Sequence, residues 1–151
     1  MKKLFVLFYS LMIAVNSFAY DSVEIDRRVM QSFGSSFPHA TDIRWNELEK
    51  TYLVNFVENS IRYQIEYAKD QSFVNITRYY RAENLPFPVR YVIENRYPGK
   101  SIFGITEISS VVAGDVINID YYIILEDAKR WITVKMDKAG NRTIVQRLRK
   151  G

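Results

Sequence analysis

The feature that most constrains the fold is a pattern that occurs twice in the chain. The segment "SSFPHATDIRW" contains an aromatic residue, Pro38 and then two apolar residues spaced by two, and "NRYPGKSIFGI" contains the same series around Pro98. In both places a run with helical spacing comes before the segment and strand-like runs come after it. The sequence therefore predicts one arrangement written twice, a helix followed by four strands.

The first predicted helix lies near the N-terminal end. Ile25, Val29 and Phe33 recur at intervals of four residues and form one apolar stripe. Residues 21–24 have the form of a capping box, with Asp first and Glu fourth, and Gly34 suits the end of the helix. One amphipathic helix is expected here.

The second predicted helix precedes the second copy of the pattern. Pro86 and Pro88 suit a helix start. Residues 97–99, Tyr-Pro-Gly, stop the helix. Its apolar stripe consists of Val89, Val92 and Ile93.

Eight runs with strand-like character follow, four after each helix. They cover residues 42–46, 51–57, 61–68, 72–80, 102–109, 117–125, 130–136 and 142–149. Strict alternation turns one apolar set inward, namely Ile43, Trp45, Tyr52, Val54, Phe56, Ile61, Tyr63, Ile65, Tyr67, Phe103, Ile105, Ile117, Ile119, Tyr121, Ile123, Leu125, Ile132, Val134 and Met136. The run 72–80 is rich in β-branched and aromatic residues, but its alternation does not define an inner face.

These runs predict an α+β fold, a tandem duplication of a helix plus a four-stranded antiparallel sheet, with the helices packed on one sheet face. Each sheet has one apolar face that its own helix covers. The expected boundaries are 1–19 for a signal peptide, 20–84 for the first repeat and 85–151 for the second, in one compact mature unit. The other sheet face is expected to meet solvent or a partner, and the sequence leaves open whether the two sheets join.

The first residues predict export. Lys2 and Lys3 precede an apolar run, and Ser17-Phe18-Ala19 has the small-x-small form that signal peptidase cleaves. An uncleaved membrane anchor is the alternative, but the apolar run is shorter than the roughly 20 residues that span a bilayer. Cleavage near Ala19 predicts a periplasmic or secreted protein without a stable membrane anchor. The chain has no Cys, which excludes disulfides and lipidation at a signal-peptide cysteine.

The charge balance argues against nucleic acid as a partner. Without Lys2 and Lys3, 19 of the 21 basic residues face 17 acidic ones, a formal net charge of +2. That is too balanced for a nucleic-acid-binding chain. The basic C-terminal segment "NRTIVQRLRKG" is interpreted as the solvated face of a last strand, with a phosphate or lipid site as the alternative.

The pattern resembles the exported bacterial PepSY-like proteins that share the β-lactamase-inhibitor-protein-like (BLIP-like) fold. The segments that carry the resemblance are "SFPHATDIRW", "YLVNF", "IEYAKD", "LPFPVRYVIENRYPGKSI", "YYIIL" and "ITVKMDKAG". The resemblance implies a non-enzymatic binding or inhibitory protein of the cell envelope. The inhibitor that gave the fold its name is stapled by disulfides and its enzyme-contacting loop has no matching motif here, so none of its functional residues is carried over.

No catalytic, metal or cofactor set is predicted. His39 is the only histidine, which leaves no ordinary histidine metal site and no Ser-His-Asp triad. Glu47 with Glu49, or Asp115 with Asp120, offers paired carboxylates, but nothing in the sequence brings either pair together. The segment "DKAGN" offers oxygen ligands for calcium, yet it is shorter than an EF-hand loop and is predicted to be a hairpin turn.

The candidate partner-binding residues are those that alternation turns away from the helices. They are Arg62 and Glu66 in the first half, and Asp120, Tyr122, Ile124, Trp131 and Lys135 in the second. Aromatic anchors, an aliphatic patch and both charge signs are typical of protein interfaces. Three alternatives remain: Tyr122 and Trp131 pack on each other across adjacent strands, the repeats or two chains cover the face, or a bulge at Gly104 or Gly114 changes the assignment locally.

Three functional hypotheses follow from these observations. The first is an exported module that binds a protein or peptide. One form of this hypothesis is that binding inhibits the partner. The second is a carrier or sensor of a small molecule, with its pocket between the helices and the sheet. The third is a hydrolase, which requires acidic residues clustered around a cleft. The sequence does not predict the partner's identity or the oligomeric state.

Overall fold

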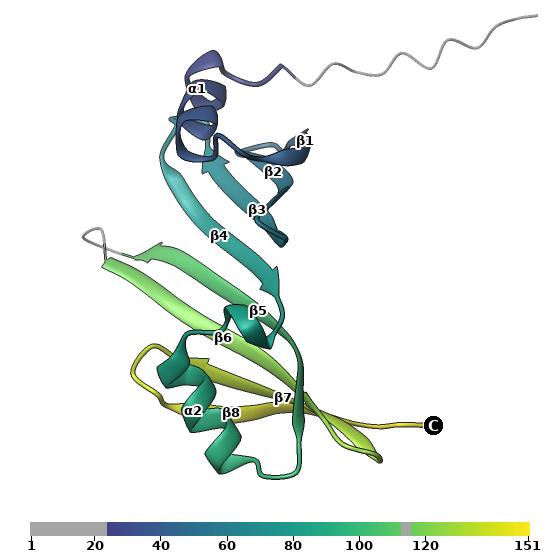
Figure 1. Ribbon diagram of the computed structural model, residues 1–151. Coiled ribbons are helices and arrows are strands. Elements are labelled where there is room, and N and C mark those ends of the chain that lie inside the picture. The colour runs from purple at the N-terminus through teal and green to yellow at the C-terminus, as the bar shows by residue number, and fades with distance from the viewer. Residues whose placement is uncertain (1–23, 113–115) are drawn as a thin grey trace, which may run out of the picture.

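The computed structural model describes residues 24–112 and 116–151. Its elements, in chain order, are α1 (Arg27–Ser36), β1 (Thr41–Glu47), β2 (Thr51–Glu58), β3 (Ile61–Ala68), β4 (Phe73–Tyr80), the 3₁₀ helix η1 (Ala82–Asn84), α2 (Phe87–Arg96), β5 (Ser101–Val112), β6 (Val116–Glu126), β7 (Arg130–Asp137) and β8 (Arg142–Arg149), as Figure 1 shows. The predicted signal peptide, 1–19, lies outside the described residues.

All eight strands form one antiparallel sheet, in which each strand pairs with the next along the chain. The two sets of four strands join through β4 and β5, whose pairing runs from Asn75 opposite Ser110 to Tyr80 opposite Ile105. The open question about the two sheets is thereby answered, since they are one. The order of helix and four strands occurs twice, and the origin of the halves in a duplication stays a prediction.

The first helix begins later than the capping-box pattern predicts. Asp26 is its N-cap and accepts a hydrogen bond from the backbone N–H of Arg28 at 2.7 Å, which satisfies one of the free N–H groups of the first turn. Val29 and Phe33 are buried, as predicted. Gly34 lies inside the helix rather than at its end.

The second helix is bounded as its prolines and glycine predict. Pro86 is the N-cap residue, and Pro88 lies in the first turn, where a missing N–H costs nothing. The helix stops before Tyr97, and Gly99 follows with a φ of 75°, a left-handed conformation that glycine adopts without strain. Val89 and Ile93 are buried against the sheet.

The apolar core consists of two clusters, one under each helix. The first joins α1 to β2 and β3 through Val54, Phe56 and Ile65, among others. The second joins α2 to β5, β6 and β7, with Ile123 and Val134 fully buried at its centre. Burying each such side chain contributes roughly 1.5–3 kcal/mol. Because each helix contributes to only one of the two clusters, it is held mainly by its own half of the sheet.

Both helices cover the same face of the sheet. Val54 lies opposite Ile65, and Ile65 lies opposite Ile76, so these three side chains are on the same face of the sheet. Four residues further along β4, and so on that same face, Tyr80 lies opposite Ile105, which is in the cluster under α2. We call this side the helix face and the other side the open face.

Two of the residues that alternation turns inward lie outside the core at irregular points of strand pairing. The pairing register shifts between Thr41 and Arg44 in β1, and between Ile102 and Gly104 in β5. Each shift is a bulge, in which β1 or β5 has one residue more than the strand it pairs with. Ile43 is 45% exposed and Phe103 is 51% exposed as a result. The bulge beside Gly104 is therefore real, and it corrects the predicted inward position of Phe103.

The end of the β5–β6 hairpin is also less covered than alternation predicts. Tyr121, Ile123 and Leu125 are buried, but Ile117 is 51% exposed. The cluster under α2 includes Ile119 as a partly buried member and does not extend to Ile117.

Candidate protein-binding face

One row of side chains crosses the open face from the first half of the sheet to the second. Arg62 lies opposite Tyr79, and Tyr79 lies opposite Thr106. The row continues from Thr106 to Tyr122 and from Tyr122 to Lys135. At the usual spacing of neighbouring strands, the row from Arg62 to Lys135 spans about 19 Å. The sheet thus brings candidate residues from both halves onto one surface.

A second row on the open face is polar. The amide of Asn75 donates a hydrogen bond to Glu66 Oε2 at 2.7 Å, and Asn75 lies opposite Ser110. Ser110 lies opposite Asn118, whose amide donates to Asp120 Oδ2 at 3.4 Å. These contacts hold Glu66 and Asp120, two of the candidate residues, in defined positions.

Lys135 is fixed between two other candidate residues. Its Nζ lies 3.0 Å from Asp120 Oδ2 and 5.6 Å from the centre of the Tyr122 ring. The hydrogen bond to Asp120 raises the pKa of the Lys135 ammonium above its usual value, so the group stays a cation. Ile124 lies beside this group, opposite Thr133, and is half-buried.

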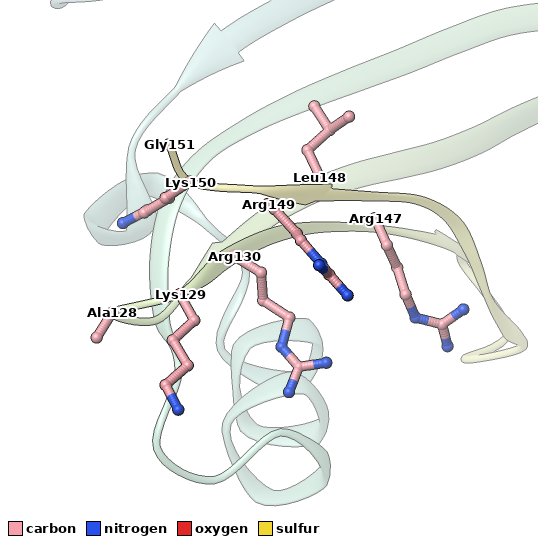
Figure 2. Close-up of a pocket in the computed structure, with 8 residues that line it drawn as sticks. All are labelled: Ala128, Lys129, Arg130, Arg147, Leu148, Arg149, Lys150 and Gly151. Atoms are coloured by element: carbon pink, nitrogen blue, oxygen red, sulfur yellow. The ribbon is translucent and has the colours of Figure 1, made fainter.

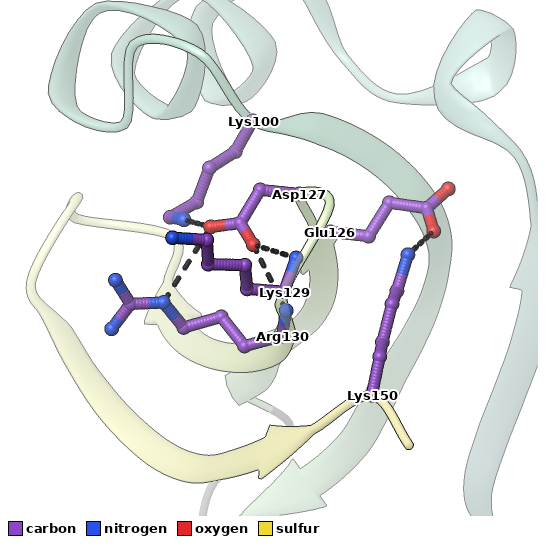
Figure 3. Close-up of polar contacts among 6 residues, drawn as sticks. All are labelled: Lys100, Glu126, Asp127, Lys129, Arg130 and Lys150. Carbon is purple, nitrogen blue, oxygen red and sulfur yellow. Dashed lines mark hydrogen bonds and ion pairs between the residues drawn. The ribbon is translucent and has the colours of Figure 1, made fainter.

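Trp131 lies at the other end of the open face. Its ring packs edge-on against Phe103 with 4.6 Å between ring centres, and Lys150 Nζ lies 4.3 Å above it. Lys150 also pairs with Glu126 at 2.7 Å, as Figure 3 shows. Leu148, the residue opposite Trp131 on β8, is 51% exposed. Aromatic, aliphatic and charged groups therefore adjoin here.

The alternative in which Tyr122 and Trp131 pack on each other is wrong. Tyr122 lies opposite Lys135, whereas Trp131 lies opposite Glu126. Four residues of an extended strand separate the two positions by about 13 Å. The ring partner of Trp131 is Phe103 instead. None of the described helices covers either aromatic residue, because both helices lie on the helix face (Figure 1).

Sequence reasoning missed three large residues of this face, namely Tyr79, Phe103 and Leu148. Their exposed fractions are 41%, 51% and 51%. Tyr79 and Leu148 lie in strands whose inner face the sequence did not define. Gly104 was the available signal for Phe103, since a glycine in a strand often marks a bulge.

The helix face contains a buried polar group at the joint between the two halves. Glu107 on β5 is 1% exposed and forms an ion pair with Arg78 on β4. The Tyr80 hydroxyl donates a hydrogen bond to Glu107 Oε2 at 2.5 Å. Burial, and then this bond to a carboxylate, raise the pKa of Tyr80 above its usual range. This set joins the two central strands by charge as well as by backbone pairing.

The remaining candidate groups are exposed or engaged in local contacts in the part of the chain that the structure describes. His39 is exposed, and its backbone N–H donates to Glu58 at 3.1 Å. Glu47 pairs with Lys69, while Asp115 lies outside the described residues. Asp137 accepts bonds from its own turn, including the Asn141 amide at 2.8 Å, so "DKAGN" is a hairpin turn. Among the described residues no cluster of three metal-ligating side chains is found.

The geometry defines an α+β protein with an open eight-stranded antiparallel sheet, and solved structures share that fold. A BLIP-like protein from Bacteroides fragilis is similar with a TM-score of 0.61 and 10% identity, over 87% of this chain and 92% of that one. A DUF2874 family protein from Bacteroides uniformis has a TM-score of 0.59 and 13% identity, over 83% and 90% of the two chains. A protein from Bacteroides eggerthii described as a candidate periplasmic protein has a TM-score of 0.58 and 12% identity, over 83% and 89%.

These likenesses establish the fold. The chain has the BLIP-like fold that its sequence pattern resembles, while membership of the PepSY-like proteins stays a prediction. No protein-family model matches the sequence, and no curated protein matches it either. Among the helices of residues 24–112 and 116–151, none has the length and apolar character needed to cross a membrane.

Proposed function

We propose that this is an exported, non-enzymatic binding protein that holds a protein or peptide partner through the open face. In a narrower form of the proposal, binding also inhibits that partner. The observation that carries the proposal is the continuous surface across β3 to β7. It combines aromatic, aliphatic and charged side chains, and the described helices leave it uncovered. The name of the BLIP-like neighbour refers to an inhibitor fold, which supports a binding role for the same architecture.

The arrangement of the aromatic residues suits partner binding. Trp131 is held by Phe103 and Lys150, and Tyr122 lies beside Lys135. Aromatic side chains that are already ordered lose little conformational entropy when a partner covers them. Trp and Tyr are also, with Arg, the residues enriched among those whose truncation costs 2 kcal/mol or more at an interface.

The test is partner capture from the cell envelope of the source organism, with mass spectrometry to identify what is retained. We expect Tyr122→Ala combined with Trp131→Ala to reduce the retained partner at least tenfold, because two anchors are lost. The matched control is Phe87→Ala combined with Tyr91→Ala. These two aromatic residues are 67% and 60% exposed, and they lie on α2, the far side of the sheet.

Unchanged capture by the double variant of the open face would contradict the proposal. So would a loss of the same size in the control pair, because that loss would place the partner on the helix face. Circular dichroism of each variant shows whether the fold is retained.

A carrier of a small molecule is the second candidate, and the pockets favour it less. It requires a cavity between a helix and the sheet. The pocket of about 890 Å³ instead lies at the β1 bulge, where Asp42 and Trp45 line it. A pocket of about 440 Å³ does lie between the end of α2 and the sheet, where Arg96 and Tyr97 face the β7–β8 turn and β8. Its lining is mostly polar, unlike the mostly apolar lining of small-molecule sites.

Export is part of the proposal. The predicted signal peptide, 1–19, and the periplasmic description of one structural neighbour support it. N-terminal sequencing of protein from the periplasm or medium is expected to begin near Tyr20. The origin of residues 20–84 and 85–151 in a duplication, and membership of the PepSY-like proteins, are also proposed, and the recurring order of elements supports the first of these.

A further inference from the structure

The last strand, β8, forms one edge of the sheet and carries arginines on its helix-face side. Within the described residues, β8 pairs with β7 alone. Arg147 lies opposite the buried Ile132, and Arg142 lies opposite the buried Met136. Figure 2 shows Arg130, Arg147 and Arg149 projecting to the same side of the strands, toward α2. The arginine row, as we call Arg142, Arg147 and Arg149 of β8 together with Arg130, which lies opposite Arg149 on β7, thus follows this edge of the sheet.

The surroundings of the arginine row are strongly positive. A pocket of about 740 Å³ at this edge is lined by Lys129, Arg130, Arg147, Arg149 and Lys150, among others. Two nearby carboxylates are already engaged, as Figure 3 shows. Asp127 pairs with Lys100 and with Arg130 Nε at 3.5 Å, and Glu126 pairs with Lys150 at 2.7 Å.

The other three arginines of the row have no carboxylate partner among the described residues. The ion pairs found there do not include Arg142, Arg147 or Arg149. Arg142 donates to the backbone oxygen of Gly140 at 3.5 Å. Like charges held side by side repel each other, so an added group with negative charge is stabilised at this edge.

The length of the row indicates an extended ligand. β8 has one extra residue between Ile144 and Gln146, where its register with β7 shifts. Arg142 and Arg149 lie opposite Met136 and Arg130, which are six residues apart on β7, or about 20 Å at 3.4 Å per residue. A single phosphate reaches only one end of such a row. A strand paired with β8 has every second side chain on the helix face, at the same spacing of about 7 Å that separates Arg147 from Arg149.

We propose that the edge of β8 accepts an extended acidic segment of another protein as a ninth strand. Backbone hydrogen bonds to the free edge supply the pairing, as in other cases of strand addition. Carboxylates at alternate positions of the added segment lie next to Arg147 and Arg149. This surface is on the other side of the sheet from Trp131 and does not depend on the open face.

A second copy of this chain fits the edge less well than an acidic segment. Pairing β8 with β8 brings two arginine rows together, and like charges on neighbouring strands destabilise the pair. Pairing β8 with β1 brings two bulged strands together, since β1 has a bulge at Asp42, whose φ is 54°, and β8 has one between Ile144 and Gln146. Charged residues on an edge strand discourage indiscriminate pairing. Here the charges select for a strand of opposite sign.

The test uses fluorescent peptides and the purified chain at physiological salt. One peptide alternates glutamate with threonine, and its counterpart alternates lysine with threonine. We expect the glutamate peptide to bind and the lysine peptide not to bind, as measured by fluorescence anisotropy. Arg147→Gln combined with Arg149→Gln is expected to weaken binding of the glutamate peptide about tenfold, since two exposed charge pairs are lost.

The matched control is Arg27→Gln combined with Arg28→Gln, which removes the same charge from exposed positions of α1. Its binding is expected to equal that of the unaltered chain. Amide hydrogen exchange is expected to slow at β8 when the glutamate peptide is bound, because a new strand pairs with its free edge.

Three results would overturn the proposal. Equal weakening in the control pair would show attraction by net charge alone. Binding without slower exchange at β8 would show that no strand is added. Binding of phosphatidylglycerol vesicles that depends on Arg147 and Arg149, with no binding of the glutamate peptide, would assign the arginine row to a membrane surface instead.

Discussion

At the scale of single residues, the ion pair between Glu107 and Arg78 is a feature of the core that the alternation of apolar and polar residues does not predict. The run 72–80 has no clear inner face in sequence because Arg78 stands on the helix face, where an apolar residue is expected. Its partner, Glu107, lies on a different strand and is separated from it by α2. Sequence spacing gives no sign of that pairing, so the buried polar group was not predicted.

Replacing the buried carboxylate tests its role. We expect Glu107→Gln to lower the free energy of unfolding by about 1–3 kcal/mol, because Arg78 loses its counter-charge while the amide still accepts from Tyr80. Urea denaturation measures this change. Glu49→Gln, at an exposed position, is the control and is expected to stay within about 0.5 kcal/mol. Equal stability of Glu107→Gln and the unaltered chain would show that the ion pair adds nothing.

At the scale of elements, alternation predicted the inward sides of β2, β3, β6 and β7 correctly. It failed where a strand bulges, and it also placed Ile117 of β6 inward although that residue is 51% exposed. Ile43 and Phe103 were placed inward, but the register shifts beside them and both are exposed. A bulge depends on how two strands pair, which one strand's sequence does not specify. The same limit explains why Phe103, the ring partner of Trp131, was missing from the candidate face.

The turn between β6 and β7 predicts a pH dependence. The Lys100 ammonium, followed by the backbone N–H groups of Lys129 and Arg130, holds the pKa of Asp127 well below its ordinary value of 3.8. A carboxyl whose folded pKa is depressed stabilises the fold above its unfolded pKa and loses that effect as the pH falls. We therefore expect the stability advantage of the unaltered chain over Asp127→Asn to shrink below about pH 3.8.

Urea denaturation of both proteins at neutral pH and at several acidic values measures that advantage. Comparing the two proteins removes the contribution of the other carboxyl groups, which titrate in both. An advantage that grows as the pH falls would contradict the assignment of Asp127.

At the scale of the whole molecule, one sheet carries both helix-covered clusters, and we expect it to unfold as a single unit. The sequence predicted both helices and the set of eight strands, but not the pairing of β4 with β5. A helix separates β4 from β5 in the chain, and contacts between the two halves fix their register. That pairing makes the open face continuous, and the Arg78–Glu107 ion pair joins the same two strands on the helix face.

The two tryptophans allow a test of this unity. Trp45 packs in the cluster under α1, and Trp131 lies in the second half on β7. We expect single-tryptophan variants, made with Trp45→Phe or Trp131→Phe, to give unfolding curves that coincide with the circular dichroism of the same variant. In either variant, a fluorescence midpoint that differs from the midpoint of its own circular dichroism curve would show that the halves unfold separately.

Hydroxyl-radical labelling of the captured complex, followed by mass spectrometry, most directly tests the claim that the open face is the binding surface. Oxidation of Trp131, Tyr122 and Phe103 is expected to fall when the partner is bound, whereas Phe87 and Tyr91 on α2 are expected to keep their free-protein rates. Protection of Phe87 and Tyr91, with Trp131 and Tyr122 as reactive as in the free protein, would contradict the account.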